Sequence, residues 1–142
     1  MIFNMRKLLF LFLLPAINAS GLAQTIEPMN SNLRPDTVFV YYLGGQSNME
    51  GFGYNKDLPP EMNKAIGNVW IFNGNHVPDN GSGGGLGLWT ELKPGNGTGF
   101  SSDGKSNTYS ERFGPELSFG LTIARHDPGK KIALIKYARG GT

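Results

Sequence analysis

Residues 37–51 read Thr-Val-Phe-Val-Tyr-Tyr-Leu-Gly-Gly-Gln-Ser-Asn-Met-Glu-Gly, and this stretch decides the fold class. Its first seven residues are a continuous β-branched and aromatic run closed by a glycine pair. That pattern is typical of a strand buried on both faces of a parallel sheet. Similar apolar runs occupy residues 68–72 and 131–138, and each is closely followed by glycine. We therefore predict three parallel strands that share one sheet.

A helix is predicted between the second and third runs. Residues 114–116 are Gly-Pro-Glu; proline suits the first helical position, and an early glutamate suits the positive end of the helix dipole. Leu117, Leu121 and Ala124 then recur at helical spacing, and the helix is expected to end at His126, before an Asp-Pro-Gly sequence. We interpret His126 as a residue interacting with the helix dipole. Strand, strand, helix and strand together indicate an α/β domain.

The predicted domain looks incomplete. Three parallel strands form a small sheet with one face poorly covered, and the last run ends in a glycine turn that should lead into another crossover helix. We expect residues 37–142 to be the N-terminal part of a truncated domain. Residues 76–112 are rich in glycine, serine and asparagine and are predicted as a long loop, a kind of segment that often carries function.

The first 36 residues indicate export. Arg6 and Lys7 precede an apolar stretch at residues 8–17, and Gly21 and Ala23 fit a cleavage site before residue 24. We predict a signal peptide over residues 1–23, with an uncleaved anchor as the alternative, and a polar linker over residues 24–36. The stretch is too short and interrupted for a membrane span, which takes about 20 apolar residues. Because the chain has no cysteine, a bacterial periplasm or exterior fits best.

Charge and composition exclude several partners. The 13 basic and 11 acidic residues leave a net charge of +2, and both surplus charges lie in the leader, so the remainder balances at 11 against 11. A neutral domain gives no electrostatic reason to expect nucleic acid. Residues 99–106 match the phosphate-loop pattern, but no strand precedes them and no helix follows, so no nucleotide is expected. A turn that begins at Asp79 is interpreted as solvated, and no metal or cofactor is expected.

The serine that follows the first predicted strand is the candidate for chemistry. Ligands of open α/β sheets bind beyond the carboxyl ends of the strands, and Ser47 lies there, two residues after paired glycines. A sharp turn of this kind exposes the hydroxyl, and nearby amides can stabilise an oxyanion. On these grounds alone Ser47 is either a nucleophile or an ordinary turn serine. It is not an α/β-hydrolase elbow, because Met49 stands where that motif requires glycine.

Three segments in order resemble one family. Residues 45–49, Gly-Gln-Ser-Asn-Met with Gly51 behind them, resemble the nucleophile block of the SGNH-hydrolase superfamily in its sialate O-acetylesterase and carbohydrate esterase family 6 branch. Residues 114–116, followed by Phe-Gly at 119–120, and residues 138–142, Ala-Arg-Gly-Gly-Thr, are similar to later blocks of that branch. The resemblance implies a flavodoxin-like, three-layer parallel sheet and hydrolysis of acetyl esters on sugars, without metal or organic cofactor.

The resemblance also implies residue roles. Ser47 would be the nucleophile, and its amide, with that of Gly141 or Gly140, would stabilise the oxyanion. Gln46 and Asn48 would shape the turn and could contact substrate.

Two further residues are considered on the substrate side. His76 lies in the predicted loop and is interpreted as a loop residue that could line the substrate side. Trp89, also in the loop, is equally a core residue or a sugar platform, whereas Trp70, in a predicted strand, is expected in the core.

The sequence departs from the family where the general base is expected. The family takes its base from an Asp-x-x-His block and a further oxyanion donor from a Gln-Gly-Glu block, and neither occurs here. A serine without a base is a weak nucleophile, so this chain by itself is expected to be nearly inactive. The alternatives are a non-catalytic carbohydrate-binding module on the same fold and a glycine-rich exported structural domain.

Overall fold

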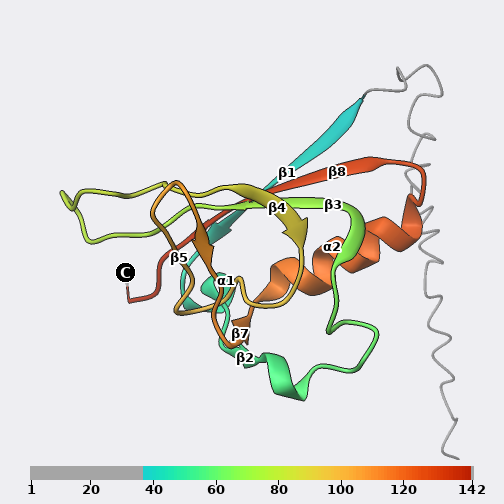
Figure 1. Cartoon of the computed structure of the whole chain (residues 1–142), viewed down its shortest axis with the longest axis horizontal. Helices are drawn as coiled ribbons and strands as arrows, with labels where there is room; N and C mark the ends of the chain where they lie inside the picture. Colours follow the sequence, from blue (N-terminus) through green and yellow to red (C-terminus); the bar gives the residue numbers. More distant parts are fainter. Residues whose placement is uncertain (1–36, 142) are drawn as a thin grey trace, which may run out of the picture. The chain divides into compact units, whose positions relative to one another are not determined.

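The computed structural model describes residues 37–141, so the signal peptide and linker predictions lie outside the described residues. A sheet of four strands organises this part of the chain, in the order β1-β8-β3-β4 (Figure 1). Its strands are β1 (Val38–Gly45), β8 (Lys131–Ala138), β3 (Ile66–Asn73) and β4 (Trp89–Leu92). The first three strands are parallel, as predicted, and β4 runs antiparallel to β3.

The parallel pairing brings three strand ends to one edge of the sheet. Gly45 of β1 pairs with Ala138 of β8, and Asn73 of β3 pairs with Lys136. Because all three strands point the same way, the segments that follow them leave from the same edge. The fold is therefore mixed α/β with a mainly parallel sheet, and its carboxyl edge gathers the segments singled out from the sequence.

Helix α2 (Pro115–His126) covers one face of the sheet (Figure 1). Its bounds agree with the predicted helix, with proline in the first turn and Asp127 as the C-cap. Leu117 is fully buried, and Leu121 and Ala124 pack partly buried against the same core. The core beneath the helix consists of aliphatic side chains of the sheet, chiefly Val69, Ile71, Leu92, Ile132 and Leu134. Each such burial contributes about 1.5–3 kcal/mol.

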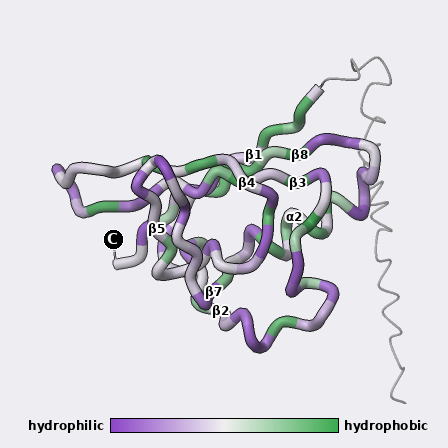
Figure 2. The backbone as a smooth tube through the Cα atoms, in the orientation of Figure 1, coloured by the Kyte–Doolittle hydropathy of each residue, from purple (hydrophilic) through white to green (hydrophobic). Residues whose placement is uncertain are grey.

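The opposite face of the sheet carries large apolar side chains in contact with solvent. Val40, Tyr42, Trp70 and Trp89 are 59%, 68%, 46% and 47% exposed. In Figure 2 much of β1 is drawn in green, the hydrophobic colour. The prediction that the first strand is buried on both faces is therefore wrong for the described residues, as is the prediction that Trp70 lies in the core. The cause is that residues 37–141 form two layers, the sheet and helix α2, so no helix among them covers the second face of the sheet.

The predicted long loop contains more regular structure than expected. Besides β4 it holds a hairpin of β5 (Ser101–Ser102) and β6 (Asn107–Thr108). A second small sheet pairs β2 (Gly53–Tyr54) with β7 (Arg112–Phe113), and the 3-10 turn η1 (Asn55–Asp57) follows β2. Two-residue strands of serine, asparagine and threonine show no hydrophobic period, so the sequence could not reveal them. Among residues 37–141 no helix is long and apolar enough to cross a bilayer.

Candidate active site

The turn that carries Ser47 begins where β1 ends. Gln46 is the N-cap of the short helix α1 (Ser47–Glu50), and its carbonyl accepts the amides of Met49 and Glu50 at 2.9 Å each. Gly51 ends the helix at a φ of +97°, and its amide donates to the Ser47 carbonyl at 3.0 Å. Ser47 is therefore half-buried at the first position of a helical turn, at the carboxyl edge of the sheet.

The glycine turn after β8 lies beside the serine turn. The Arg139 amide donates to the Gly45 carbonyl at 3.1 Å, which extends the strand pairing into both turns. A Cβ placed on Gly140 would lie 3.5 Å from the Ser47 Cβ and 2.6 Å from Oε2 of Glu50. The structure thus brings Ser47 and Gly140 together, and the close approach explains why residue 140 has no side chain. Gly141 has a φ of +75°, in the left-handed region that favours glycine.

Glu50 connects these two turns. Its Oε2 accepts the Gly140 amide at 2.7 Å, and its backbone carbonyl accepts the Lys136 ammonium at 2.9 Å. The side chain is only 12% exposed. Among the described residues nothing accepts the amide of Gly141, so of the glycine pair it is the Gly141 amide that stays available to another acceptor.

A buried ion pair lies directly beneath the two turns. Lys136 Nζ is 2.6 Å from Oε2 of Glu116 and also donates to the Asn96 carbonyl at 2.7 Å. The exposed fractions of the Lys136 and Glu116 side chains are 2% and 0%. Burial lowers the pKa of Lys136, and the neighbouring carboxylate of Glu116 opposes that shift. The other oxygen of Glu116 accepts the Gly114 amide at 2.9 Å, so the pair also fixes the start of α2.

Glycines allow the loop after β4 to return against the serine turn. The Thr98 amide donates to the Gly51 carbonyl at 2.8 Å. A Cβ on Gly97 would lie 2.8 Å from that same carbonyl oxygen, and a Cβ on Gly114 would lie 3.0 Å from the Gly51 Cα. Three backbone segments can therefore pass close together only without side chains at these positions.

The two histidines occupy different surroundings. His76 Nε2 lies 3.7 Å from Oε1 of Glu50, and the His76 side chain is 36% exposed. His76 also lines a small polar cavity of about 10 Å³ with Asn73, Asn96 and Lys136, enough for roughly one water molecule. His126 is 83% exposed at the end of α2 and lies 3.5 Å from Asp127, as expected of a helix-terminal residue.

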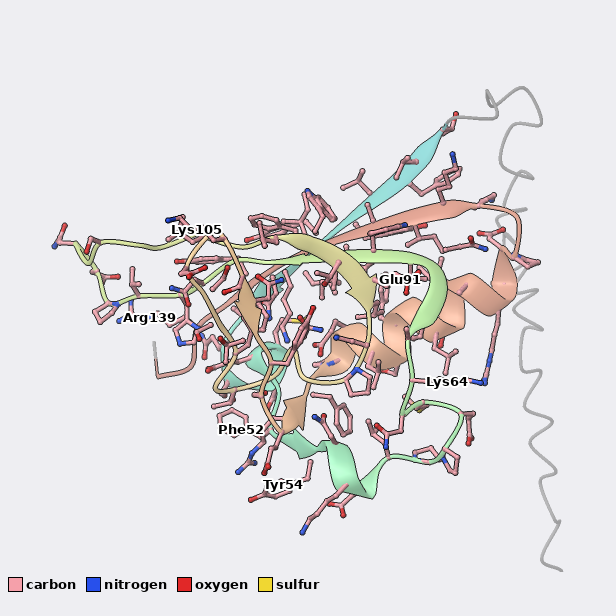
Figure 3. All side chains as sticks on the ribbon, viewed as in Figure 1. Phe52, Tyr54, Lys64, Glu91, Lys105 and Arg139 are labelled. Carbon is pink, nitrogen blue, oxygen red and sulfur yellow. The ribbon has the colours of Figure 1, made fainter. Side chains whose placement is uncertain are left out.

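A wider groove lies beside the serine turn, at the ends of β1 and β8. It measures about 490 Å³, and its lining includes Tyr42, Gly45, Tyr137 and Arg139. Arg139 forms an ion pair with Asp79 at 2.6 Å across the groove, and Figure 3 shows Arg139 beside the loop that follows β3.

The remaining predicted site residues lie at the surface. Gln46 and Asn48 are exposed on either side of Ser47. Trp89 is the first residue of β4, not a loop residue as predicted, and its ring lies 5.6 Å from that of Phe72. Trp89 also lines a shallow apolar depression on the open sheet face with Trp70. In the described part of the chain no three His, Cys, Asp or Glu side chains gather as a metal site would require.

Sequence reasoning missed the three charged residues that hold the site. Lys136 falls within an apolar strand run, Ile-Ala-Leu-Ile-Lys-Tyr-Ala, where a charge must either find a partner or lie at an edge. Glu116 was expected to interact with the helix dipole at the start of the helix, but its side chain is fully buried. Glu50 lies one helical turn after Ser47, a spacing that places both on one face of a helix. The lysine within the apolar run was the available signal.

One comparison with known proteins identifies a family. Residues 37–142 match the family described as carbohydrate esterase, sialic acid-specific acetylesterase. The chain is also similar to the crystal structure of a protein from Arabidopsis thaliana, with 21% sequence identity and a TM-score of 0.47. That similarity covers 77% of this chain and 42% of the Arabidopsis chain, so this chain spans less than half the length of that protein. No curated protein gave a significant match.

Proposed function

The chain belongs to the carbohydrate esterase family of sialic acid-specific acetylesterases, and we propose that it removes O-acetyl groups from a carbohydrate through an acyl-enzyme on Ser47. The observation that carries this proposal is the adjacency of Ser47 and Gly140 at the carboxyl edge of the sheet. This adjacency places the nucleophile beside a turn whose next amide, that of Gly141, has no acceptor among the described residues, and acyl transfer requires such free donors near the nucleophile.

The proposed reaction has two steps. The Ser47 hydroxyl attacks the acetyl carbonyl carbon, its proton passes to a general base, and the sugar alcohol leaves with a proton returned by that base. Water then attacks the acetyl-serine and releases acetate. In both steps the amides of Ser47 and Gly141 stabilise the negative oxygen, because the Gly140 amide is already taken by Glu50. Each such donor typically contributes about 2.7–4 kcal/mol to lowering the barrier.

The general base is proposed to come from a segment beyond residue 142. His126 lies at the far end of α2, and His76 faces Glu50. Two features of the described residues support a larger domain: β1 is an edge strand, and the sheet face that carries Val40 and Trp70 is open. In this proposal further strands and helices complete a three-layer, flavodoxin-like sheet, and residues 37–142 alone are nearly inactive.

The substrate and the location are proposed on separate grounds. The groove beside the serine turn offers the rings of Tyr42 and Tyr137 with the charged pair of Arg139 and Asp79. Aromatic rings and planar polar groups suit a sugar, and we propose that the carbohydrate lies along this groove. The signal peptide predicted over residues 1–23 supports a secreted or periplasmic location.

The test compares Ser47→Ala with Ser118→Ala in the complete gene product. Ser118 is an exposed serine of α2 and serves as the matched control. Hydrolysis of p-nitrophenyl acetate and of an O-acetylated sugar should be lost in Ser47→Ala and unchanged in Ser118→Ala. Equal rates for both variants would remove Ser47 from the mechanism.

A carbohydrate-binding module is the second candidate. It is favoured by one observation, that neither His76 nor His126 is hydrogen-bonded to the Ser47 hydroxyl within the described residues. Calorimetric binding of an O-acetylated sugar without any release of acetate by the complete gene product would support this module and contradict the esterase.

A further inference from the structure

We propose that Glu50 is a positioning residue for the oxyanion site: its carboxylate holds the glycine turn after β8 so that the Gly141 amide, not the Gly140 amide, faces the reacting oxygen. This proposal rests on the proposed esterase function. It adds a role for a side chain that contacts neither the substrate nor the reacting atoms.

The geometry makes Glu50 the link between the nucleophile and the second oxyanion donor. Ser47 and Glu50 lie on the same short helix, so a contact made by Glu50 fixes a partner relative to Ser47. Oε2 accepts the Gly140 amide at 2.7 Å across 90 residues of sequence. A hydrogen bond from an amide to a carboxylate is roughly twice as strong as one between neutral groups. The glycine turn is therefore held by a charge-assisted bond from the serine helix itself.

The buried network beneath the serine helix fixes the backbone of Glu50. Lys136 donates to the Glu50 backbone carbonyl and to the Glu116 carboxylate, so its ammonium lies close to both acids. On the outer side, His76 Nε2 lies 3.7 Å from Oε1 of Glu50. With 12% exposure the Glu50 side chain has little freedom to leave the Gly140 amide.

The space around Gly140 supports the same role. A Cβ on this residue would lie 2.6 Å from Oε2 of Glu50, far inside van der Waals contact. Glycine at this position therefore lets the carboxylate reach the backbone amide. Once the Gly140 amide is engaged, the Gly141 amide is the one left without an acceptor among the described residues. Losing the Glu50 contact would let the turn shift, and a misplacement of 1 Å can cost about 100-fold in rate.

Nuclear magnetic resonance of the complete gene product tests the contact without any need for activity. In the wild type, the Gly140 amide proton should resonate downfield and exchange slowly with solvent. In Glu50→Ala it should move upfield and exchange at least about ten times faster, whereas Glu50→Gln, which keeps an acceptor oxygen, should stay near the wild type. Glu61→Ala removes an exposed glutamate and should change nothing. An unchanged Gly140 amide in Glu50→Ala would overturn the proposal.

Kinetics test the positioning role. We expect kcat for acetyl ester hydrolysis to fall about 100-fold in Glu50→Ala, KM to stay within about threefold, and Glu50→Gln to recover most of kcat. A raised KM at unchanged kcat, or an unchanged kcat, would overturn the role. If Glu50→Ala does not fold, Glu50→Asp carries the same test, because it keeps the charge but shortens the side chain by one methylene.

The failure of this proposal is distinguishable from that of the proposed function. A wild type without esterase activity but with a protected Gly140 amide would refute the esterase, and the catalytic role of Glu50 with it, while leaving the contact intact. An active wild type whose kcat does not depend on Glu50 would refute the positioning role alone.

Discussion

Replacing Lys136 by methionine should be among the most damaging single substitutions in this chain. The ammonium of Lys136 lies 2.6 Å from Oε2 of Glu116, and it also donates to the carbonyls of Glu50 and Asn96. Methionine fills a similar volume, so packing changes little. The variant leaves a fully buried carboxylate without its counter-charge. The Glu50 carbonyl loses its donor, and the Asn96 carbonyl keeps only the side-chain amide of Asn73.

The magnitude follows from this burial. Breaking a buried ion pair by removing one partner costs about 3–5 kcal/mol, a large fraction of the roughly 5–15 kcal/mol that stabilises a typical domain. For a loss of about 4 kcal/mol and an m-value of about 2 kcal/mol/M, the urea midpoint should fall by about 2 M. Lys105→Met, which removes an exposed lysine, should change stability by less than about 0.5 kcal/mol.

A double-mutant cycle separates the charge effect from packing. Glu116→Gln keeps an acceptor for the Gly114 amide but removes the charge. When Glu116→Gln is combined with Lys136→Met, the double variant should recover about 2 kcal/mol of the free energy of unfolding lost in Lys136→Met, because no uncompensated charge remains buried. Urea unfolding followed by circular dichroism measures all four states of the cycle. A double variant as unstable as the sum of the single variants would refute the reasoning, since the two side chains would then act independently.

Three further outcomes follow from the same contacts. Because burial lowers the pKa of Lys136, the unfolded chain binds more protons than the folded chain at pH values between that lowered pKa and 10.5. The free energy of unfolding of the wild type should therefore rise with pH across that interval. Urea unfolding measures this rise, with the uncharged double variant of Lys136 and Glu116 as the reference. Gly140→Ala should lower kcat for acetyl ester hydrolysis about 100-fold with the fold intact by circular dichroism, because its Cβ would collide with the Glu50 carboxylate. Trp70→Gln should change the unfolding free energy of residues 1–142 by less than about 1 kcal/mol, since the ring is 46% exposed, but should cost about 3–5 kcal/mol in the complete gene product if further helices cover this face.

The sequence predicted the parallel strands and the helix because each is a contiguous, patterned segment. The strand predicted over residues 131–138 and the helix that starts at Pro115 agree with the structure in their bounds. Burial was predicted less well. The run at residues 38–43 has the composition of a strand covered on both sides, but composition does not say whether the covering helices are present. Tyr42 is therefore 68% exposed, although the pattern of its strand predicted that the strand is buried.

The parts of the site that depend on local sequence could be predicted, whereas the contacts between residues far apart in the sequence could not. Ser47 and the Gly140 turn could be singled out because each follows a recognisable strand, and parallel strands bring their carboxyl ends together. Glu50 could not, because its partner amide lies 90 residues away, and nothing in the local pattern distinguishes it from a solvated acid. The pairing of Lys136 with Glu116 is equally non-local, across 20 residues.

The charged residues beneath the site contribute more to fixing the positions of the surrounding backbone segments than to stability. A buried ion pair is often no more stabilising than well-packed apolar residues would be. Its value here lies in what Lys136 reaches: the last carbonyl of the serine helix, the loop at Asn96 and the first turn of α2 all converge on one ammonium. An apolar side chain could fill that volume but could not fix three backbone segments in register. The network therefore orients the serine helix, and through Glu50 it orients the glycine turn as well.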